Sequence, residues 1–299
     1  MSVNLIQSFP GFDIKADVEL ANYTNTKVGG HAEWVFWPKS VEQLRYVLVE
    51  LQNLNQTLPI TVLGNASNII VTDQGLAGLV IFLTNLTSIE VHDQQIKAGA
   101  GAWLIDVTRQ AQRHNLAGLE WAAGIPGSVG GAVYMNAGAY GGQVDAWLES
   151  VEVLTPTGEL QTLTTAQLAF AYRHSVLHDT DDVIVSATFK LKPGEASAID
   201  ALMEDYNTRR ASKQPLEFPS CGSVFKRPEG HFAGKLIMDA GLQGYQVGGA
   251  QVSTKHAGFI VNKGNATATD YIAVIKHVQT IIKEQYEIDL ETEVKIFGA

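Results

Sequence analysis

Two segments have the composition of loops that bind phosphate through the main chain. Seven of the 28 glycines lie in residues 122–142, AAGIPGSVGGAVYMNAGAYGG. Such a density predicts neither a helix nor a strand, because each glycine adds entropy to the unfolded backbone. Residues 63–71, LGNASNIIV, form a second loop between two apolar runs. Successive backbone N–H groups in loops of this kind can bind phosphate oxygens without a cationic side chain.

Both loops also have an ordinary interpretation, because a glycine-rich loop often serves only as a tight connection. Their framing by predicted strands favours a binding role. Neither loop matches the G-x-G-x-x-G fingerprint of Rossmann domains, and the chain has no Gly-Lys-Ser/Thr run of a P-loop. A dinucleotide bound here therefore requires a different fold.

Three kinds of polar side chain could act on a substrate. Arg173, in FAYRHS, could clamp a carboxylate with two hydrogen bonds or make a surface ion pair. Ser223 follows Gly222 but lacks the second glycine of a G-x-S-x-G elbow, which disfavours a serine hydrolase. Near the C-terminus, periodicity alone leaves Glu291 and Glu293 as equal candidates for a functional acid.

Charge is distributed unevenly along the chain. The net charge of −10 argues against a nucleic-acid partner, but residues 206–263 hold eight basic and three acidic residues. This segment is either a solvated surface or an anion site suited to a small phosphorylated ligand. His256 lies beside Lys255 in it and is a candidate ligand contact.

Composition indicates a globular protein of 299 residues with one large or two modest cores. The first residues do not resemble a signal peptide, and no apolar run is long enough to span a bilayer. The single cysteine, Cys221, fits a reducing compartment, and no Cys/His cluster has zinc spacing. We therefore expect a cytoplasmic protein without a metal or a membrane partner, and favour a monomer.

Hydrophobic periodicity predicts a mixture of helices and strands. Helices are expected from residue 40, where Ser40 and Gln43 form a capping box, over 103–114 and 198–210, and from Thr267, which Asp270 caps. Strands are expected at residues 60–63, 69–71, 79–83, 150–154, 183–191 and 291–297. The pattern divides the chain into units of residues 1–88, 89–194 and 195–299, of the α+β class.

Four runs in this order resemble the UDP-N-acetylenolpyruvoylglucosamine reductase family, in its shorter form. They are GIPGSVGGAVYMNAGAYGG, CGSVFKRPEGHFAGKLI, VSTKHAGFIVN and ETEVKIFG, and the resemblance covers about residues 25–297. It implies an FAD-binding domain of the vanillyl-alcohol-oxidase type, made of two α+β subdomains, followed by a smaller α+β substrate-binding domain. It also implies non-covalent FAD, with NADPH as the hydride donor.

The resemblance assigns roles to particular residues. It implies that Arg173 binds the enolpyruvyl carboxylate, that Ser223 protonates substrate carbon, and that Glu293 rather than Glu291 is the functional acid. It implies FAD contacts from the two loops and from the stretch after them: Gly64, Asn65, Ala66, Ser67, Asn68, Gly124, Ile125, Pro126, Gly127, Ser128, Gly131, Asn136, Ala137 and Gly138. We expect Lys226 and Arg227 to contact the diphosphate of UDP, and His256 to contact the substrate.

The implied reaction is the NADPH-dependent reduction of UDP-N-acetylglucosamine enolpyruvate to UDP-N-acetylmuramate. Two alternatives have other consequences. A flavin oxidase of the same fold would pass electrons to oxygen and often tethers its flavin through histidine, and the glycine loops contain none. A non-catalytic module that binds a sugar nucleotide would need the basic segment but not the flavin loops.

Overall fold

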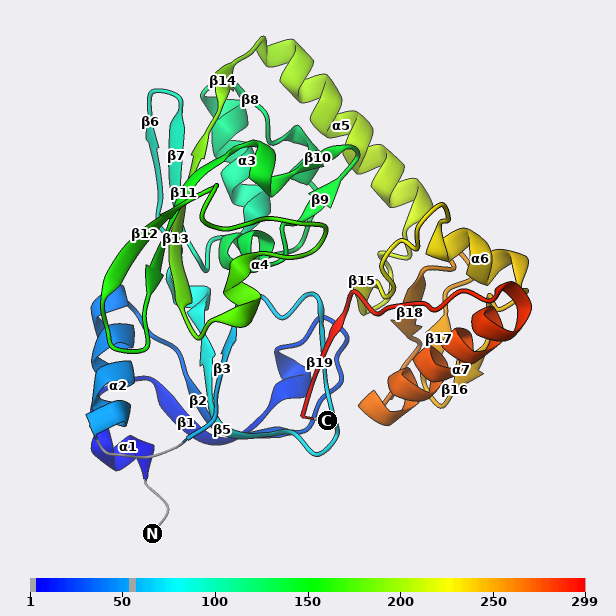
Figure 1. Ribbon diagram of the computed structural model, residues 1–299, viewed down its shortest axis with the longest axis horizontal. Helices are drawn as coiled ribbons and strands as arrows, with labels where there is room; N and C mark the ends of the chain where they lie inside the picture. Colours follow the sequence, from blue (N-terminus) through cyan, green and yellow to red (C-terminus); the bar gives the residue numbers. More distant parts are fainter. Residues whose placement is uncertain (1–3, 54–57, 299) are drawn as a thin grey trace. The chain divides into compact units, whose positions relative to one another are not determined.

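The computed structural model describes residues 4–53 and 58–298 (Figure 1). The chain divides into two compact units, each built from separate stretches of sequence. Unit 1 is Met1–Ala16, Trp34–Asn65 and Gly78–Arg209, and unit 2 is Asp17–Glu33, Ala66–Ala77 and Arg210–Ala299. The division at residues 88 and 194 stays a prediction. Helices and mainly antiparallel sheets coexist in the chain, as expected for an α+β protein.

Three strands run across the boundary between the units: β1 (Ile14–Glu19), β2 (His31–Phe36) and β5 (Leu76–Phe82). They belong to a four-stranded sheet with the order β1-β2-β5-β3. Within unit 1, β3 (Ile60–Leu63) pairs in parallel with β5. Helix α5 (Ala196–Lys213) also crosses the boundary.

Unit 1 centres on a five-stranded antiparallel sheet with the order β12-β11-β13-β7-β6 (Figure 1). Its strands are β6 (Ile89–His92), β7 (Gln95–Gly99), β11 (Leu148–Leu154), β12 (Leu160–Thr164) and β13 (Val183–Lys190). Two small ladders add β8 (Leu116–Ala117) with β14 (Lys192–Pro193), and β9 (Gly138–Ala139) with β10 (Gly142–Gln143). The predicted strands at 150–154 and 183–191 are confirmed.

The helices of unit 1 bury apolar faces in one large core. They are α1 (Leu5–Ser8), α2 (Val41–Asn53), α3 (Leu104–Arg113) and α4 (Val129–Tyr134), with the 3-10 turns η2 (Leu83–Asn85), η3 (Glu120–Ala122), η4 (Val144–Ala146) and η5 (Val176–Asp179). At the start of α2, Ser40 Oγ accepts from Gln43 N, but the Gln43 side chain accepts from Lys39 N. Half of the predicted capping box is therefore present, because the Gln43 side chain bonds the backbone N–H of Lys39 instead of that of Ser40.

The prediction that the glycine-rich stretch forms neither helix nor strand is wrong. Residues 129–134 form α4, and β9 and β10 form a short hairpin. The reason is close packing: a Cβ added at Gly130 would lie 3.0 Å from Ala100 Cβ, and Gly130 N donates to Ala100 O at 2.9 Å. Glycine lets this helix approach the backbone beside β7, which offsets its poor helix propensity.

Unit 2 contains a four-stranded antiparallel sheet with the order β15-β18-β17-β16, and α7 contacts β16 and β17 (Figure 1). The elements of this unit are η1 (Leu20–Asn22), β4 (Ile69–Val71), β15 (Ser220–Ser223), α6 (Ala233–Asp239), β16 (Gln246–Val247), β17 (Ala250–Val252), β18 (Phe259–Asn262), α7 (Ala268–Tyr286) and β19 (Lys295–Phe297). The predicted capping box of Thr267 and Asp270 at the start of α7 is confirmed.

The predicted terminal strand over residues 291–297 is too long. Only β19 (Lys295–Phe297) is a strand, paired in parallel with β4, while Thr292 makes an isolated bridge to Phe225. Residues 291–294 are bonded to a different segment, because Glu293 N and Val294 N both donate to Val224 O. Alternating residue types therefore did not define one continuous ladder.

No helix in the described part of the chain is long and apolar enough to cross a membrane. The cytoplasmic location and the monomeric state stay predictions.

Candidate active site

The two predicted cofactor loops meet inside unit 1. Gly64 follows β3, and Ser128 is the N-cap of α4, where its Oγ accepts from Gly131 N at 3.3 Å. A Cβ added at Gly64 would lie only 2.0 Å from Ser128 Oγ. The backbone of the first loop therefore contacts the side chain of the second, as a shared binding site requires.

The glycine loop preceding α4 has no strand directly on either side, contrary to the prediction, since η3 precedes it and α4 follows. Two hydrogen bonds hold it, from Leu104 N to Gly127 O and from Val129 N to Ala102 O, both 2.9 Å. Within residues 4–53 and 58–298, the N–H groups of Gly127 and Ser128 donate no hydrogen bond. Two adjacent N–H groups are thus available to an anion.

A buried polar group without a partner supports a ligand at the first loop. In unit 1, Asn65 Nδ2 is buried and has no hydrogen-bond partner in the described structure. Burying such a donor unpaired costs free energy, which an acceptor oxygen of a ligand would offset. Asn65 therefore fits a phosphate oxygen of FAD.

The stretch Asn136 to Gly138 and Arg173 lie together in unit 1. Arg173 Nη2 donates to Gly138 O at 3.0 Å, and Arg173 Nη1 lies 3.5 Å from Asn136 O. The backbone of Arg173 has a φ of 56°, a left-handed conformation that residues other than glycine rarely adopt. Such conformations persist where the surroundings enforce them, and they are enriched at functional sites.

The side chain of Asn136 is fully engaged within the protein. It is 1% exposed, its Nδ2 donates to Asp145 Oδ2 at 3.1 Å and to Ala171 O at 3.2 Å, and its Oδ1 accepts from Asp145 N at 3.1 Å. A cofactor contact from this residue would therefore come from its backbone.

A β-bulge exposes Ser223 in unit 2. The register of β15 against β18 shifts between Ser220 and Ser223, and Gly222 between them has a φ of 77°. Cys221 and Ser223 would share a face in a regular strand, but Cys221 is buried and Ser223 is exposed. Bulges commonly re-aim a side chain in this way. The bulge accounts for the absence of a strand period around Ser223 in the sequence.

The structure distinguishes the two candidate acids. The side chain of Glu291 is 74% exposed and pairs with Lys226 Nζ at 3.0 Å, whereas Glu293 is half-buried. Glu293 N donates to Val224 O at 2.7 Å, and Glu293 O accepts from Asn68 Nδ2 at 3.2 Å. Glu293 thus lies beside the residue after Ser223 and beside a predicted cofactor residue.

Two further side chains lie near these acids. Burial, with a smaller contribution from the Glu293 carboxylate, raises the pKa of the Cys221 thiol to about 12, so this cysteine stays protonated at neutral pH. Burial and the neighbouring Lys226 charge lower the pKa of Lys295. Lys295 therefore adds a second cation beside Lys226. The sequence placed Lys295 in the predicted strand of residues 291–297, but not among the candidate site residues.

The predicted substrate residues have different environments. Lys226 makes the surface ion pair with Glu291, and the Arg227 guanidinium lies 4.1 Å from the Phe232 ring centroid. His256 Nδ1 accepts from Gly258 N at 3.2 Å, and Gly258 O accepts from Val224 N at 2.9 Å. His256 is therefore connected to the Ser223 segment through one residue.

Burial lowers the pKa of His256, and the nearby Lys213 charge lowers it further. The imidazole is thus biased toward its neutral form, with Nδ1 as an acceptor and Nε2 as a donor. No group of three or more histidine, cysteine, aspartate or glutamate side chains in the described residues could hold a metal ion.

Two family models match the chain. Residues 32–164 match an FAD binding domain, and residues 214–297 match the C-terminal domain of UDP-N-acetylenolpyruvoylglucosamine reductase. With the loops described above, the first match places the protein in the class of FAD-binding proteins.

Relatives over the full length give the family. The UDP-N-acetylenolpyruvoylglucosamine reductase of Levilactobacillus brevis is 54% identical over 298 residues, covering 100% of this chain and 97% of the relative. That of Lactiplantibacillus plantarum is 53% identical, covering 100% and 98%. The crystal structure of UDP-N-acetylenolpyruvylglucosamine reductase (MurB) from Thermus caldophilus matches with a TM-score of 0.82 at 34% identity, covering 95% of this chain and 99% of that one. The chain belongs to the UDP-N-acetylenolpyruvoylglucosamine reductase family.

Family membership confirms the predicted α+β architecture, the FAD cofactor and the oxidoreductase class. The prediction of an enzyme is therefore confirmed, and the alternative of a non-catalytic module that binds a sugar nucleotide is wrong. The roles of individual residues stay predictions.

Proposed function

We propose that this enzyme uses NADPH and FAD to reduce UDP-N-acetylglucosamine enolpyruvate to UDP-N-acetylmuramate, a precursor of peptidoglycan. The names of its full-length relatives support this substrate. The structural observation that carries the proposal is the hydrogen bond that holds the guanidinium of Arg173 to Gly138 O, in the stretch Asn136 to Gly138 that is expected to contact FAD.

Arg173 would bind the carboxylate of the enolpyruvyl group. Bound FAD supplies the redox chemistry, as a carrier of two electrons and one hydrogen from NADPH to the methylene carbon of the substrate. As the methylene becomes a methyl group, negative charge develops on the adjacent carbon and its carboxylate. A fixed guanidinium stabilises that charge without having to reorganise, which is the most effective form of electrostatic catalysis.

Ser223 would donate a proton to the carbon that carries the carboxylate. The new C–H bond takes its proton from the serine hydroxyl, and the resulting alkoxide is reprotonated from water. A serine hydroxyl is a weak acid, so the step requires close alignment with a strongly basic carbon. The bulge at Gly222, which exposes this hydroxyl, supports the assignment.

The remaining predicted residues would bind and tune the substrate. Glu293, held by Val224 O and Asn68 Nδ2 through its backbone, would set the electrostatic environment of the proton donor. The cations of Lys226 and Arg227, together with the Nε2 donor of His256, would contact the diphosphate and uridine. The surface ion pair of Lys226 with Glu291 is weak enough to be exchanged for such a ligand.

An anaerobic absorbance experiment tests the proposal. The purified protein should show a flavin spectrum, NADPH should bleach it, and UDP-N-acetylglucosamine enolpyruvate should restore it with formation of UDP-N-acetylmuramate. Restoration by oxygen but not by the enolpyruvyl substrate would instead identify an oxidase. Flavin that NADPH leaves oxidised would refute the assigned hydride donor.

A further inference from the structure

We propose that Ser175 and Asn136 are positioning residues for Arg173, an inference that rests on the role proposed for Arg173 above. They fasten residues 171–175, which we call the arginine turn, to the segment 134–138 that ends α4 and begins β9. Neither side chain needs to contact substrate or cofactor for this function.

The arginine turn is a tight reversal with Arg173 near its tip. Ala171 N donates to His174 O at 3.1 Å, and His174 N donates to Ala171 O at 3.2 Å. Tyr172 is 50% exposed, and the Arg173 guanidinium lies over its ring, 5.0 Å from the centroid. Because Arg173 is in the left-handed conformation, contacts outside the turn must stabilise this geometry.

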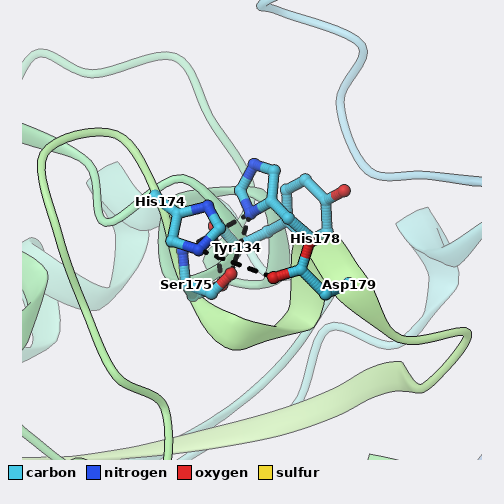
Figure 2. A network of polar contacts seen from close by, with 5 residues as sticks. All are labelled: Tyr134, His174, Ser175, His178 and Asp179. Atoms are coloured by element: carbon cyan, nitrogen blue, oxygen red, sulfur yellow. Dashed lines mark hydrogen bonds and ion pairs between the residues drawn. The ribbon is translucent and has the colours of Figure 1, made fainter.

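Ser175 fastens the C-terminal end of the turn. It is 0% exposed, and its Oγ donates to Tyr134 O at 2.8 Å. His178 stacks on the Tyr134 ring with centroids 3.9 Å apart, and its Nδ1 lies 3.4 Å from Ser175 N in a capping box (Figure 2). His174 and Asp179 complete the network with an ion pair of 3.8 Å (Figure 2).

Asn136 fastens the N-terminal end. Its Nδ2 donates to Ala171 O at 3.2 Å, and the guanidinium of Arg173 itself donates to Gly138 O. Both ends and the charged tip of the turn are therefore tied to one short segment, 134–138. Three attachments at separate points restrict translation and rotation of the guanidinium before any ligand arrives, which lowers the entropic cost of binding a carboxylate.

The first experiment measures the position of the turn without reference to catalysis. FAD-loaded Ser175→Ala is digested with trypsin, and cleavage after Arg173 is followed by mass spectrometry. Loss of the hydrogen bond to Tyr134 O, together with the cap that Ser175 Oγ provides for His178 N, should speed this cleavage by about fivefold relative to the unmodified enzyme. The matched control is Thr108→Val, because Thr108 is 1% exposed and its Oγ1 also donates to a backbone carbonyl, Ile105 O at 2.7 Å. Equal cleavage after Arg173 in the two variants would overturn the inference.

The second experiment separates the two half-reactions by stopped-flow absorbance. Ser175→Ala should reduce its flavin with NADPH at the normal rate, but oxidation by the enolpyruvyl substrate should slow by about tenfold. A general loss of structure would instead slow both half-reactions and would also appear in Thr108→Val. That result would likewise overturn the inference.

A double-mutant cycle connects Ser175 to Arg173. In an Arg173→Met background, Ser175→Ala should slow the substrate half-reaction no further, because the group that it positions is gone. Additive effects of the two substitutions would show that Ser175 acts independently of Arg173, against the inference. If cleavage after Arg173 rises in Ser175→Ala while Arg173→Met retains full activity, the positioning stands and the proposed role of Arg173 fails.

Discussion

The two residues that we assign to charge stabilisation and proton donation have opposite environments. In unit 1, the guanidinium of Arg173 is held by a backbone carbonyl, on a turn fastened at both ends. In unit 2, Ser223 is exposed at a bulge, and its hydroxyl has no hydrogen-bond partner in the part of the chain that the structure describes. One group is fixed by the protein, whereas the other is presented to a ligand.

The difference follows from the chemistry required of each group. A guanidinium stabilises developing charge best when it need not move, so internal hydrogen bonds help it. A weakly acidic hydroxyl must give its proton to the substrate, and a strong internal acceptor would compete for that proton. The comparison predicts that removing each group affects a different part of the catalytic cycle.

The largest effect should come from Arg173→Met, which keeps an unbranched apolar stem but removes the guanidinium and its charge. We expect kcat/KM for the enolpyruvyl substrate to fall by about a thousandfold, because a charged pair with the carboxylate is lost. FAD content, measured by absorbance, should remain normal. The comparison would fail if kcat/KM changed by less than about threefold.

Ser223→Ala should lower turnover by about a hundredfold while flavin reduction by NADPH keeps its rate. Stopped-flow traces with NADPH alone and with substrate added afterwards measure the two halves separately. Ser88→Ala, at another exposed serine, is the control. If both half-reactions stayed fast in Ser223→Ala, another group would have to be the proton donor.

Gly64→Ala tests the contact between the two loops. The added Cβ would meet Ser128 Oγ at 2.0 Å, so we expect the affinity for FAD to fall by about tenfold. Equilibrium titration of the apoprotein with FAD measures this change. Removing the hydroxyl in Gly64→Ala/Ser128→Ala should restore part of the affinity. No recovery in the double variant would mean that the two loops are not coupled through this contact.

The smallest effect concerns how the stability of unit 2 depends on pH through His256. The pKa of His256 is lowered in the folded protein. As pH falls below about 6.5, the imidazole of His256 is therefore protonated in the unfolded chain before it is protonated in the folded one. The stability linked to the neutral imidazole is thus present above that pH and is lost as pH falls through the folded pKa. His256→Gln should flatten the fall in Tm between neutral and acidic pH.

Local patterns predicted the long elements well. Thr267 with Asp270 marked the start of α7, and the apolar residues Tyr271, Ile275, Val278 and Ile282 are buried along its length. These signals succeed because capping and amphipathic periodicity act within a few residues. The strands of the four-stranded sheet in unit 2, β15 to β18, gave no comparable signal, since these runs of two to four residues show no clear alternation.

The glycine-rich stretch and the terminal strand were harder to predict from the sequence, for a related reason. The helical conformation of α4 depends on Ala100, which Gly130 approaches closely, and residues 291–294 depend on Val224. Propensity and alternation describe a segment alone, whereas these conformations follow from a partner distant in the chain.

The sequence by itself determined the class of cofactor, the family and the identities of the chemically capable residues, because four separate motifs occur in a fixed order. Tertiary structure alone decided how those residues are held. It showed that Gly64 meets Ser128, that a bulge exposes Ser223, that Glu293 rather than Glu291 is half-buried, and that Ser175 and Asn136 fasten the turn of Arg173. The physical reason is that a residue type is a local property, while burial and hydrogen bonding require contact between distant parts of the chain.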